Sequence, residues 1–196
     1  MLDGIEDANV KRLATAFDSL KTNRKWVLVK NVLPDTFSNS NIKLKGRAMP
    51  INFGKTKVAS TRTMQEVKNP EDILADIISA LQHVFPECVH VAIKLLKSRA
   101  GDLSQSTHLD HQNHLPLPSK LSEFHYSAII SIEDSTSILV GKTDNQVSYD
   151  IPKYSMFLFR GDLPHAGAGY PSGNSRLFIS ISSDKFKVTD DVFIVN

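Results

Sequence analysis

The sequence lacks the residues that secreted and membrane-spanning proteins depend on. It has one cysteine, Cys88, in 196 residues, so no internal disulfide can form and a structural zinc site built on thiolates is a poor fit. No apolar run approaches the roughly 20 residues of a membrane-spanning helix. The opening residues, MLDGIEDANVKR, carry acids where a signal peptide is basic and then apolar. We therefore expect an intracellular protein without membrane contact, with the cytoplasm favoured and the nucleus left open.

The composition is that of an ordinary globular chain. Hydrophobic residues make up 41% and charged residues 22% of it, and a chain of this length forms one well-buried core. We expect a single domain over residues 1–196. Within it, residues 1–100 would form a support region of helices and strands, and residues 101–196 would form the core that carries the functional site.

Acidic residues are scarce in one long stretch of the first half. Between Thr36 and Gln65 there are six basic residues and no acidic one. Such a stretch could contact a polyanion, so a nucleic-acid substrate or a protein substrate is left open. A solvated loop or strand face is the more common explanation of such a stretch.

Hydrophobic spacing predicts two helices followed by many short strands. Residues 7–22 carry one apolar stripe at three- and four-residue steps, and residues 69–85 carry a clearer one. We expect a short strand in KWVLVKNVLP, a loop over 35–55, and a series of strands after Pro86. Strands in succession without intervening helices favour an antiparallel sandwich or jelly roll, with the two helices covering one sheet.

A metal site is indicated by the segment STHLDHQNH, residues 106–114, which contains three of the seven histidines. Residues two apart in a strand point the same way, so His108 and Asp110 would share one face. His165 in FRGDLPHAGAGY is the best third ligand, because it follows a strongly apolar strand and a turn at Gly161. Two imidazoles and one carboxylate leave three positions of an octahedral metal open, as in non-haem Fe(II) oxygenases.

A cation is expected near the same site. Arg176 lies 11 residues after His165, at the head of the next apolar strand. If the two strands are neighbours, its guanidinium points into the same cavity, where it could bind a carboxylate through two parallel hydrogen bonds. The alternative is a surface ion pair with Asp162 or another neighbour.

The order His108, Asp110, His165 and Arg176 resembles the Fe(II)/2-oxoglutarate-dependent oxygenases over roughly residues 103–184. The resemblance implies a mainly β fold, a double-stranded β-helix of the cupin-like jelly-roll type with flanking helices. It also implies Fe(II) on the two histidines and the aspartate, with 2-oxoglutarate and O2 as co-reactants and the far carboxylate of 2-oxoglutarate on Arg176. Tyr126 matches a tyrosine that helps to hold this carboxylate in the prolyl-hydroxylase-like branch, so that branch is weakly favoured.

The sequence departs from this pattern beside the arginine. Many members of the family have a serine two residues after it as a second contact to 2-oxoglutarate, but this chain has Phe178. Tyr126 would have to compensate. Because neighbouring strand residues face opposite ways, His125 is expected to point away from the site.

The resemblance implies a hydroxylase or demethylase that couples oxidative decarboxylation of 2-oxoglutarate to oxidation of a substrate that the sequence does not identify. Two alternatives stay open. One is a cupin-like metalloenzyme that does not use 2-oxoglutarate, and the other is a non-catalytic jelly-roll binding module whose histidines are incidental.

Overall fold

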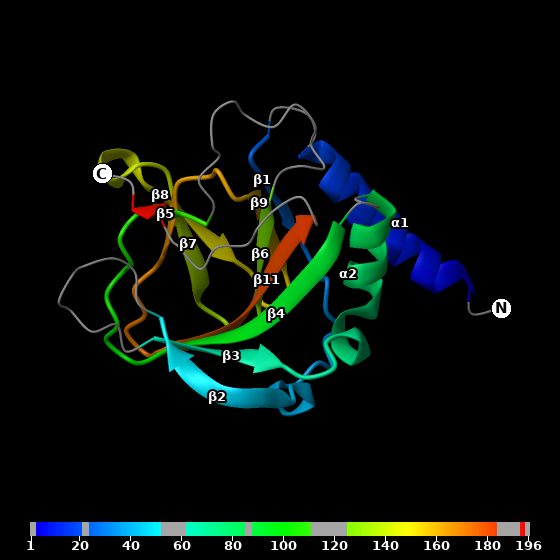
Figure 1. The fold of residues 1–196 in the computed structure, drawn as a ribbon, viewed down its shortest axis with the longest axis horizontal. Helices are drawn as coiled ribbons and strands as arrows, with labels where there is room; N and C mark the ends of the chain where they lie inside the picture. Colours follow the sequence, from blue (N-terminus) through cyan, green and yellow to red (C-terminus); the bar gives the residue numbers. More distant parts are fainter. Residues whose placement is uncertain are drawn as a thin grey trace.

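Two helices lie beside two antiparallel β-sheets in the computed structural model, which describes residues 3–20, 24–51, 62–84, 88–110, 125–183 and 193–194 (Figure 1). The helices are α1 (Asp3–Ser19) and α2 (Glu71–Val84). This arrangement confirms the expectation of a mainly β chain with two helices. In the described residues no helix is both long and apolar enough to span a membrane.

The larger sheet has seven strands in the order β1-β9-β6-β11-β4-β3-β2. Their bounds are β1 (Trp26–Val29), β2 (Leu44–Pro50), β3 (Thr63–Val67), β4 (Cys88–Ser98), β6 (Tyr126–Ser131), β9 (Met156–Arg160) and β11 (Asn174–Ser183). The sheet combines strands from before and after residue 100. For example, β4 from the first half of the chain pairs with β11 from the second half.

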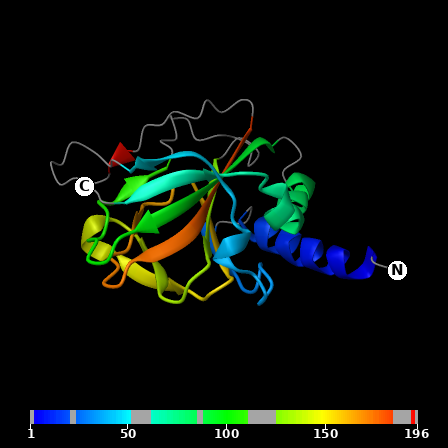
Figure 2. The same cartoon turned by 90° about the horizontal axis from the view of Figure 1, so that it is seen from below.

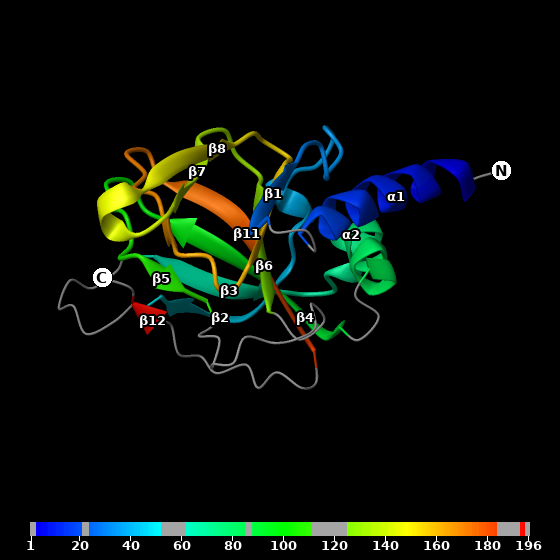
Figure 3. The same ribbon diagram turned by 90° about the horizontal axis from the view of Figure 1, so that it is seen from above.

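The smaller sheet has five strands in the order β12-β5-β10-β7-β8. Their bounds are β5 (His108–Leu109), β7 (Thr136–Val140), β8 (Val147–Ile151), β10 (His165–Gly167) and β12 (Phe193–Ile194). Two short 3-10 helices, η1 (Asn39–Asn41) and η3 (Thr143–Asn145), lie in the connections. Figure 3 shows the smaller sheet and the helices on opposite sides of β6 and β11.

Alternate residues of the central strands therefore face two different layers. Ala128 and Ile130 of β6 belong to the cluster that contains the helix side chains, whereas Ile129 belongs to a second cluster with residues of the smaller sheet. On β9, Leu158 faces the helices and Phe157 faces the smaller sheet. This period of two follows from the pleat of a strand, and the almost uninterrupted apolar sequences of both strands reflect burial on both faces.

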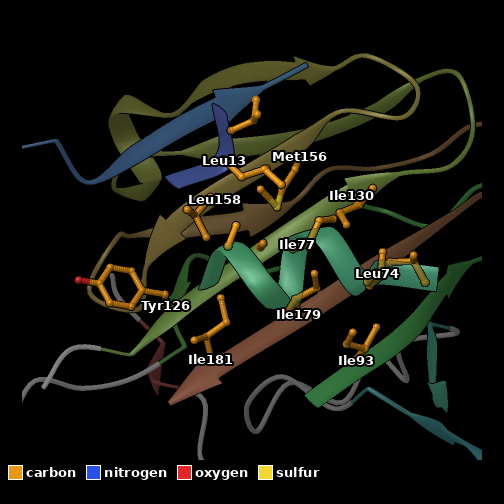
Figure 4. Close-up of a cluster of buried hydrophobic side chains, with 14 of the residues drawn as sticks. Leu13, Leu74, Ile77, Ile93, Tyr126, Ile130, Met156, Leu158, Ile179 and Ile181 are labelled. Atoms are coloured by element: carbon orange, nitrogen blue, oxygen red, sulfur yellow. The ribbon is translucent and has the colours of Figure 1, made fainter. Parts of the chain in front are cut away.

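The two predicted apolar stripes are the buried faces of the helices. Phe17 of α1 is 0% exposed and Ile77 of α2 is 1% exposed, and both join the cluster against the larger sheet. Figure 2 shows the two helices together on one side of the molecule. Figure 4 shows Leu74 and Ile77 of α2 facing side chains of the strands, among them Ile179.

The predicted loop over 35–55 is wrong over residues 44–50, where β2 forms the edge of the larger sheet. Six of the seven β2 residues are exposed, so the strand lacks the apolar alternation by which a half-buried strand is recognised. Its pairing with β3 is interrupted between Lys45 and Met49, and Gly46 has a φ of 71° there. A bulge at glycine and basic side chains are both common on edge strands, where they oppose aggregation.

We expect Phe17→Ala to lower the free energy of unfolding by about 3 to 5 kcal/mol, because it leaves a cavity in the core between α1 and the larger sheet. Thr15→Ala is the matched control on the exposed face of the same helix, and it should change the free energy by no more than about 0.5 kcal/mol. Urea unfolding measures both. Equal midpoints for the two variants would contradict the packing of α1 on the sheet.

Candidate metal centre

The pairing of two short strands brings the predicted ligands together. β5 and β10 are antiparallel neighbours, and His108 stands directly opposite His165. Asp110 follows β5 immediately. Its Oδ1 lies 3.8 Å from Nε2 of His108 and 3.6 Å from Nε2 of His165, and one ligand atom from each residue lies within 4.8 Å of the others. Donor atoms at this spacing can share one ion through bonds of about 2 Å.

Both imidazoles are fixed in the tautomer that a metal needs. Nδ1 of His108 lies 2.8 Å from the carbonyl oxygen of Ser106, and Nδ1 of His165 lies 3.0 Å from that of Leu163. A carbonyl oxygen only accepts hydrogen bonds, so each Nδ1 carries the proton and donates it. Each Nε2 is therefore the ring nitrogen that is turned toward Asp110, an orientation typical of metal-bound histidine.

The carboxylate of Asp110 is held by β6. The Ser127 hydroxyl donates a hydrogen bond to Oδ2, which leaves Oδ1 directed at the two imidazoles. Burial by itself raises the pKa of Asp110, but His165, His108 and the Ser127 hydroxyl outweigh it, so the pKa lies below its ordinary value. Asp110 is therefore an anion in the folded protein and can bind a cation.

His108 is neutral over the physiological range. Burial, followed by the neighbouring His165, lowers its pKa from 6.5 to about 4. A neutral imidazole does not have to lose a proton before it binds a metal. The surroundings are apolar, since the ring of Phe159 meets His165 edge-on at 4.6 Å and belongs to the buried cluster between the sheets.

Arg176 is buried on the same side of the larger sheet as Ser127. It is 2% exposed, and it shares one face of β11 with Ser180, which pairs with Ser127. Its Nη1 donates to Ser98 Oγ at 3.1 Å and to Asn174 Oδ1 at 3.3 Å. Within the described residues no carboxylate forms an ion pair with it.

The alternative of a surface ion pair between Arg176 and Asp162 is wrong. Asp162 is paired with Arg160 at 2.8 Å and with Lys25 at 3.2 Å. Arg176 instead lies 5.0 Å from the centre of the Tyr170 ring. Its charge is thus kept inside the protein, on the side where the metal ligands lie.

Tyr126 does not lie where the sequence interpretation placed it, and that assignment is wrong on this geometry. Its ring is 0% exposed in the cluster between the larger sheet and the helices (Figure 4). Ser127, the next residue, is the one that faces the metal ligands. A shift of one residue in a strand moves every side chain to the other face.

The same shift corrects His125, which was expected to point away. Its Nε2 lies 2.8 Å from Ser180 Oγ, and it lowers the pKa of Asp110 by less than His165, His108 and Ser127 do. The signal in the sequence was the alternation in HYSAIIS, in which polar residues at 125, 127 and 131 share one face. His111 and His114, the other histidines of the segment 106–114, lie outside the described residues.

A second buried arginine was also missed. Arg62, at the end of the basic stretch, is 2% exposed and lies 5.7 Å from the centre of the same Tyr170 ring as Arg176. In the sequence it is one of six basic residues, and nothing in their spacing separates it from the exposed ones. Only the fold distinguishes it.

No protein-family model matches the sequence and no curated protein matches it, whereas solved structures do. A prolyl-4-hydroxylase from Pseudomonas putida has a TM-score of 0.61 and 13% identity, over 87% of this chain and 98% of its own. A prolyl hydroxylase from Trichoplax adhaerens, in complex with a hypoxia inducible factor peptide fragment, has a TM-score of 0.60 and 9% identity over 91% and 92%. An oxidoreductase of the 2OG-Fe(II) oxygenase family from Burkholderia pseudomallei has a TM-score of 0.59 and 11% identity over 87% and 90%.

These likenesses confirm the kind of fold that the resemblance implied. The chain has the fold of the 2OG-Fe(II) oxygenases, and prolyl hydroxylases are among its structural neighbours. At such low identities the likeness establishes the fold, and the reaction has to be argued from the site.

We expect Ser127→Ala to weaken metal binding by about 10- to 100-fold, because it removes the hydrogen bond that orients the Asp110 carboxylate. Isothermal titration calorimetry of the metal-free protein with Mn(II) measures the affinity. Ser148→Ala on the exposed face of β8 is the matched control and should bind like the wild type. An unchanged affinity in Ser127→Ala would show that Asp110 does not depend on β6 for its orientation.

The metal-free protein should lose stability as the pH falls from about 6.5 to about 4. The unfolded chain takes up a proton on His108 near pH 6.5, whereas the folded chain does so only near pH 4, so acid favours the unfolded state in this window. The contribution is on the order of 3 kcal/mol at most. Thermal unfolding of wild type and His108→Gln across this range measures it. If both proteins lose stability equally, the low pKa of His108 is wrong.

Proposed function

We propose that the protein is an Fe(II)- and 2-oxoglutarate-dependent oxygenase of the hydroxylase or demethylase type. The observation that carries the proposal is the convergence of His108, Asp110 and His165, whose Nε2 and carboxylate oxygen atoms point at one another. In the described residues this group offers three ligands, which leaves about half of an octahedral coordination sphere to other molecules. Bound Fe(II), together with 2-oxoglutarate and O2, would supply the oxidising chemistry.

The chain's own part is to hold and isolate this centre. The two carbonyl oxygens at Ser106 and Leu163 keep the imidazoles oriented, and Ser127 holds the carboxylate. Phe159 and its apolar neighbours between the sheets limit the access of water. Such a site favours an open metal that reacts with bound molecules rather than a closed structural metal.

We propose that the two sheets form a double-stranded β-helix. Four strands of the larger sheet, in the order β9-β6-β11-β4, would face four of the smaller sheet, in the order β8-β7-β10-β5. From β4 to β11 the chain passes repeatedly between the two sheets, which supports this assignment. On this proposal, residues 1–196 form one domain, and β4 supplies a core strand from the N-terminal half.

2-Oxoglutarate is the proposed cosubstrate because it has a group for each of the two charged positions, the candidate metal centre and Arg176. The metal centre can take a keto acid group, and Arg176 can take the second carboxylate. Arg176 is buried with hydrogen bonds to neutral oxygens, so an anion would offset the cost of burying its charge. A cupin-like metalloenzyme or a binding module would have no such use for the arginine.

The substrate is proposed only as a class. The Trichoplax neighbour carries a peptide, and β2, with the basic part of the 36–65 stretch that it contains, is an exposed sheet edge. A peptide is therefore the first candidate, and a nucleic acid is the second. We keep the proposal of an intracellular protein, with the cytoplasm favoured.

Release of succinate from 2-oxoglutarate tests this function. With Fe(II) and O2 the wild type should form succinate even without substrate, and Asp110→Ala should lose both this turnover and metal binding, because two imidazoles alone hold the ion poorly. Asp144→Ala, which removes an exposed carboxylate on η3, should behave like the wild type. Panels of peptides and oligonucleotides should then show which class raises the rate.

The two rivals predict other results. One equivalent of bound Fe(II) without any effect of 2-oxoglutarate would favour the cupin-like metalloenzyme. Absence of metal binding in the wild type would favour the binding module. An unaltered affinity for 2-oxoglutarate in Arg176→Met would show that the cosubstrate assignment is wrong.

A further inference from the structure

Arg62 is the largest buried polar side chain that the proposed mechanism does not yet use. It directly precedes β3 and is 2% exposed. Its Nη2 donates to the carbonyl oxygens of Leu103 and Ala168, each at 2.6 Å. Carbonyl oxygens orient a guanidinium, but they do not neutralise its charge. The side chain is therefore held in a fixed position by these two contacts.

Two guanidiniums are buried at one place. The central carbon of Arg62 lies 5.7 Å and that of Arg176 lies 5.0 Å from the centre of the Tyr170 ring. Burial, followed by the charge of Arg176, lowers the pKa of Arg62 to about 10, with Tyr170 and Asp102 acting in the opposite direction. Both arginines stay protonated at neutral pH. Like charges inside a protein repel each other, as the effect of Arg176 on the pKa of Arg62 shows, and an anion bound by both would offset that repulsion.

Arg62 lies on the side of the smaller sheet that carries the metal ligands. Gly167 follows His165 by two residues on β10, so a side chain at 167 would point the same way as the imidazole. A Cβ there would lie 2.7 Å from Nη1 of Arg62. The same Cβ would lie closer still to Oε1 of Gln105, so glycine at this position leaves the space in front of β10 to the Gln105 amide and the Arg62 guanidinium.

The position two residues after Arg176 offers no polar contact to a ligand. Phe178 is two residues further on the same face of β11, and it packs against the apolar cluster between the sheets. Ser98 and Asn174 already accept hydrogen bonds from Nη1 of Arg176, so a second guanidinium would offer a carboxylate more donors than Arg176 alone. Arg62 reaches the same region from a segment 114 positions earlier in the sequence.

We propose that Arg62 is a second cosubstrate-binding residue, which shares with Arg176 the carboxylate of 2-oxoglutarate that lies farther from the metal. The inference rests on the proposed function. It makes Arg62 a determinant of specificity, because two guanidiniums favour a 2-oxo acid that ends in a carboxylate over one that ends in a neutral group.

The test compares two ligands that differ only at that end. The full chain is loaded with Mn(II) and titrated with 2-oxoglutarate or with 2-oxoglutaramate, in which an amide replaces the far carboxylate. Arg62→Met should weaken 2-oxoglutarate binding by about 10- to 100-fold, the size expected for a hydrogen bond between charged groups. It should leave the affinities for 2-oxoglutaramate and Mn(II) within about threefold, so the preference for the carboxylate falls.

Two further variants complete the comparison. Arg24→Met removes an exposed arginine and should leave both affinities unchanged. Arg62→Lys keeps the charge and loses the planar fork, so it should retain an intermediate preference. If Arg62→Met does not fold, Arg62→Lys decides, and an unchanged ratio of the two affinities in that variant would overturn the proposal.

The failure of this inference is distinguishable from the failure of the proposed function. If Arg62→Met weakens both ligands equally, Arg62 only fastens Leu103 to Ala168, and the inference is wrong while the cosubstrate stands. If the Mn(II)-loaded wild type binds 2-oxoglutarate no better than 2-oxoglutaramate, the cosubstrate assignment is wrong, and the inference falls with it.

Discussion

The site depends on one antiparallel pairing, in which His108 of β5 stands opposite His165 of β10. This register closes a separation of 57 positions in the sequence and sets the two Nε2 atoms on either side of Asp110. Shifting it by one residue would turn one imidazole to the other face of the sheet. The neighbouring strands stabilise this pairing. β7 pairs with the other edge of β10, from His165 to Gly167.

Burial then decides the chemistry that these residues can perform. Between the sheets the His108 imidazole is neutral and the Asp110 carboxylate is charged, which is the protonation state that a divalent ion requires of these two groups. Further from the metal centre the same burial retains two positive charges beside one tyrosine ring. On the proposed function, the first is a cation-binding position and the second an anion-binding one, which suits an acid with a carboxylate at each end.

The sequence predicted the ligands because the four residues are spaced as the strands require. His108 and Asp110 are two apart, and Arg176 lies near the start of the strand that follows the strand of His165. The sequence prediction failed at Tyr126. The alternation in HYSAIIS shows which residues share a face of the strand, but it does not show which face lies toward the helices and which toward the smaller sheet. It also failed at β2, whose exposed edge carries no apolar alternation.

By itself the sequence determined which elements form and which side chains could bind a metal, because local periodicity and short spacings are properties of neighbouring residues. Only the tertiary structure decided that Ser127 holds Asp110, that Tyr126 packs under the helices, and that Arg62 meets Arg176 at Tyr170. Those contacts join strands from different parts of the chain. They depend on sheet order and register, which are set by the packing of the whole core and leave no signature in the spacing of any one segment.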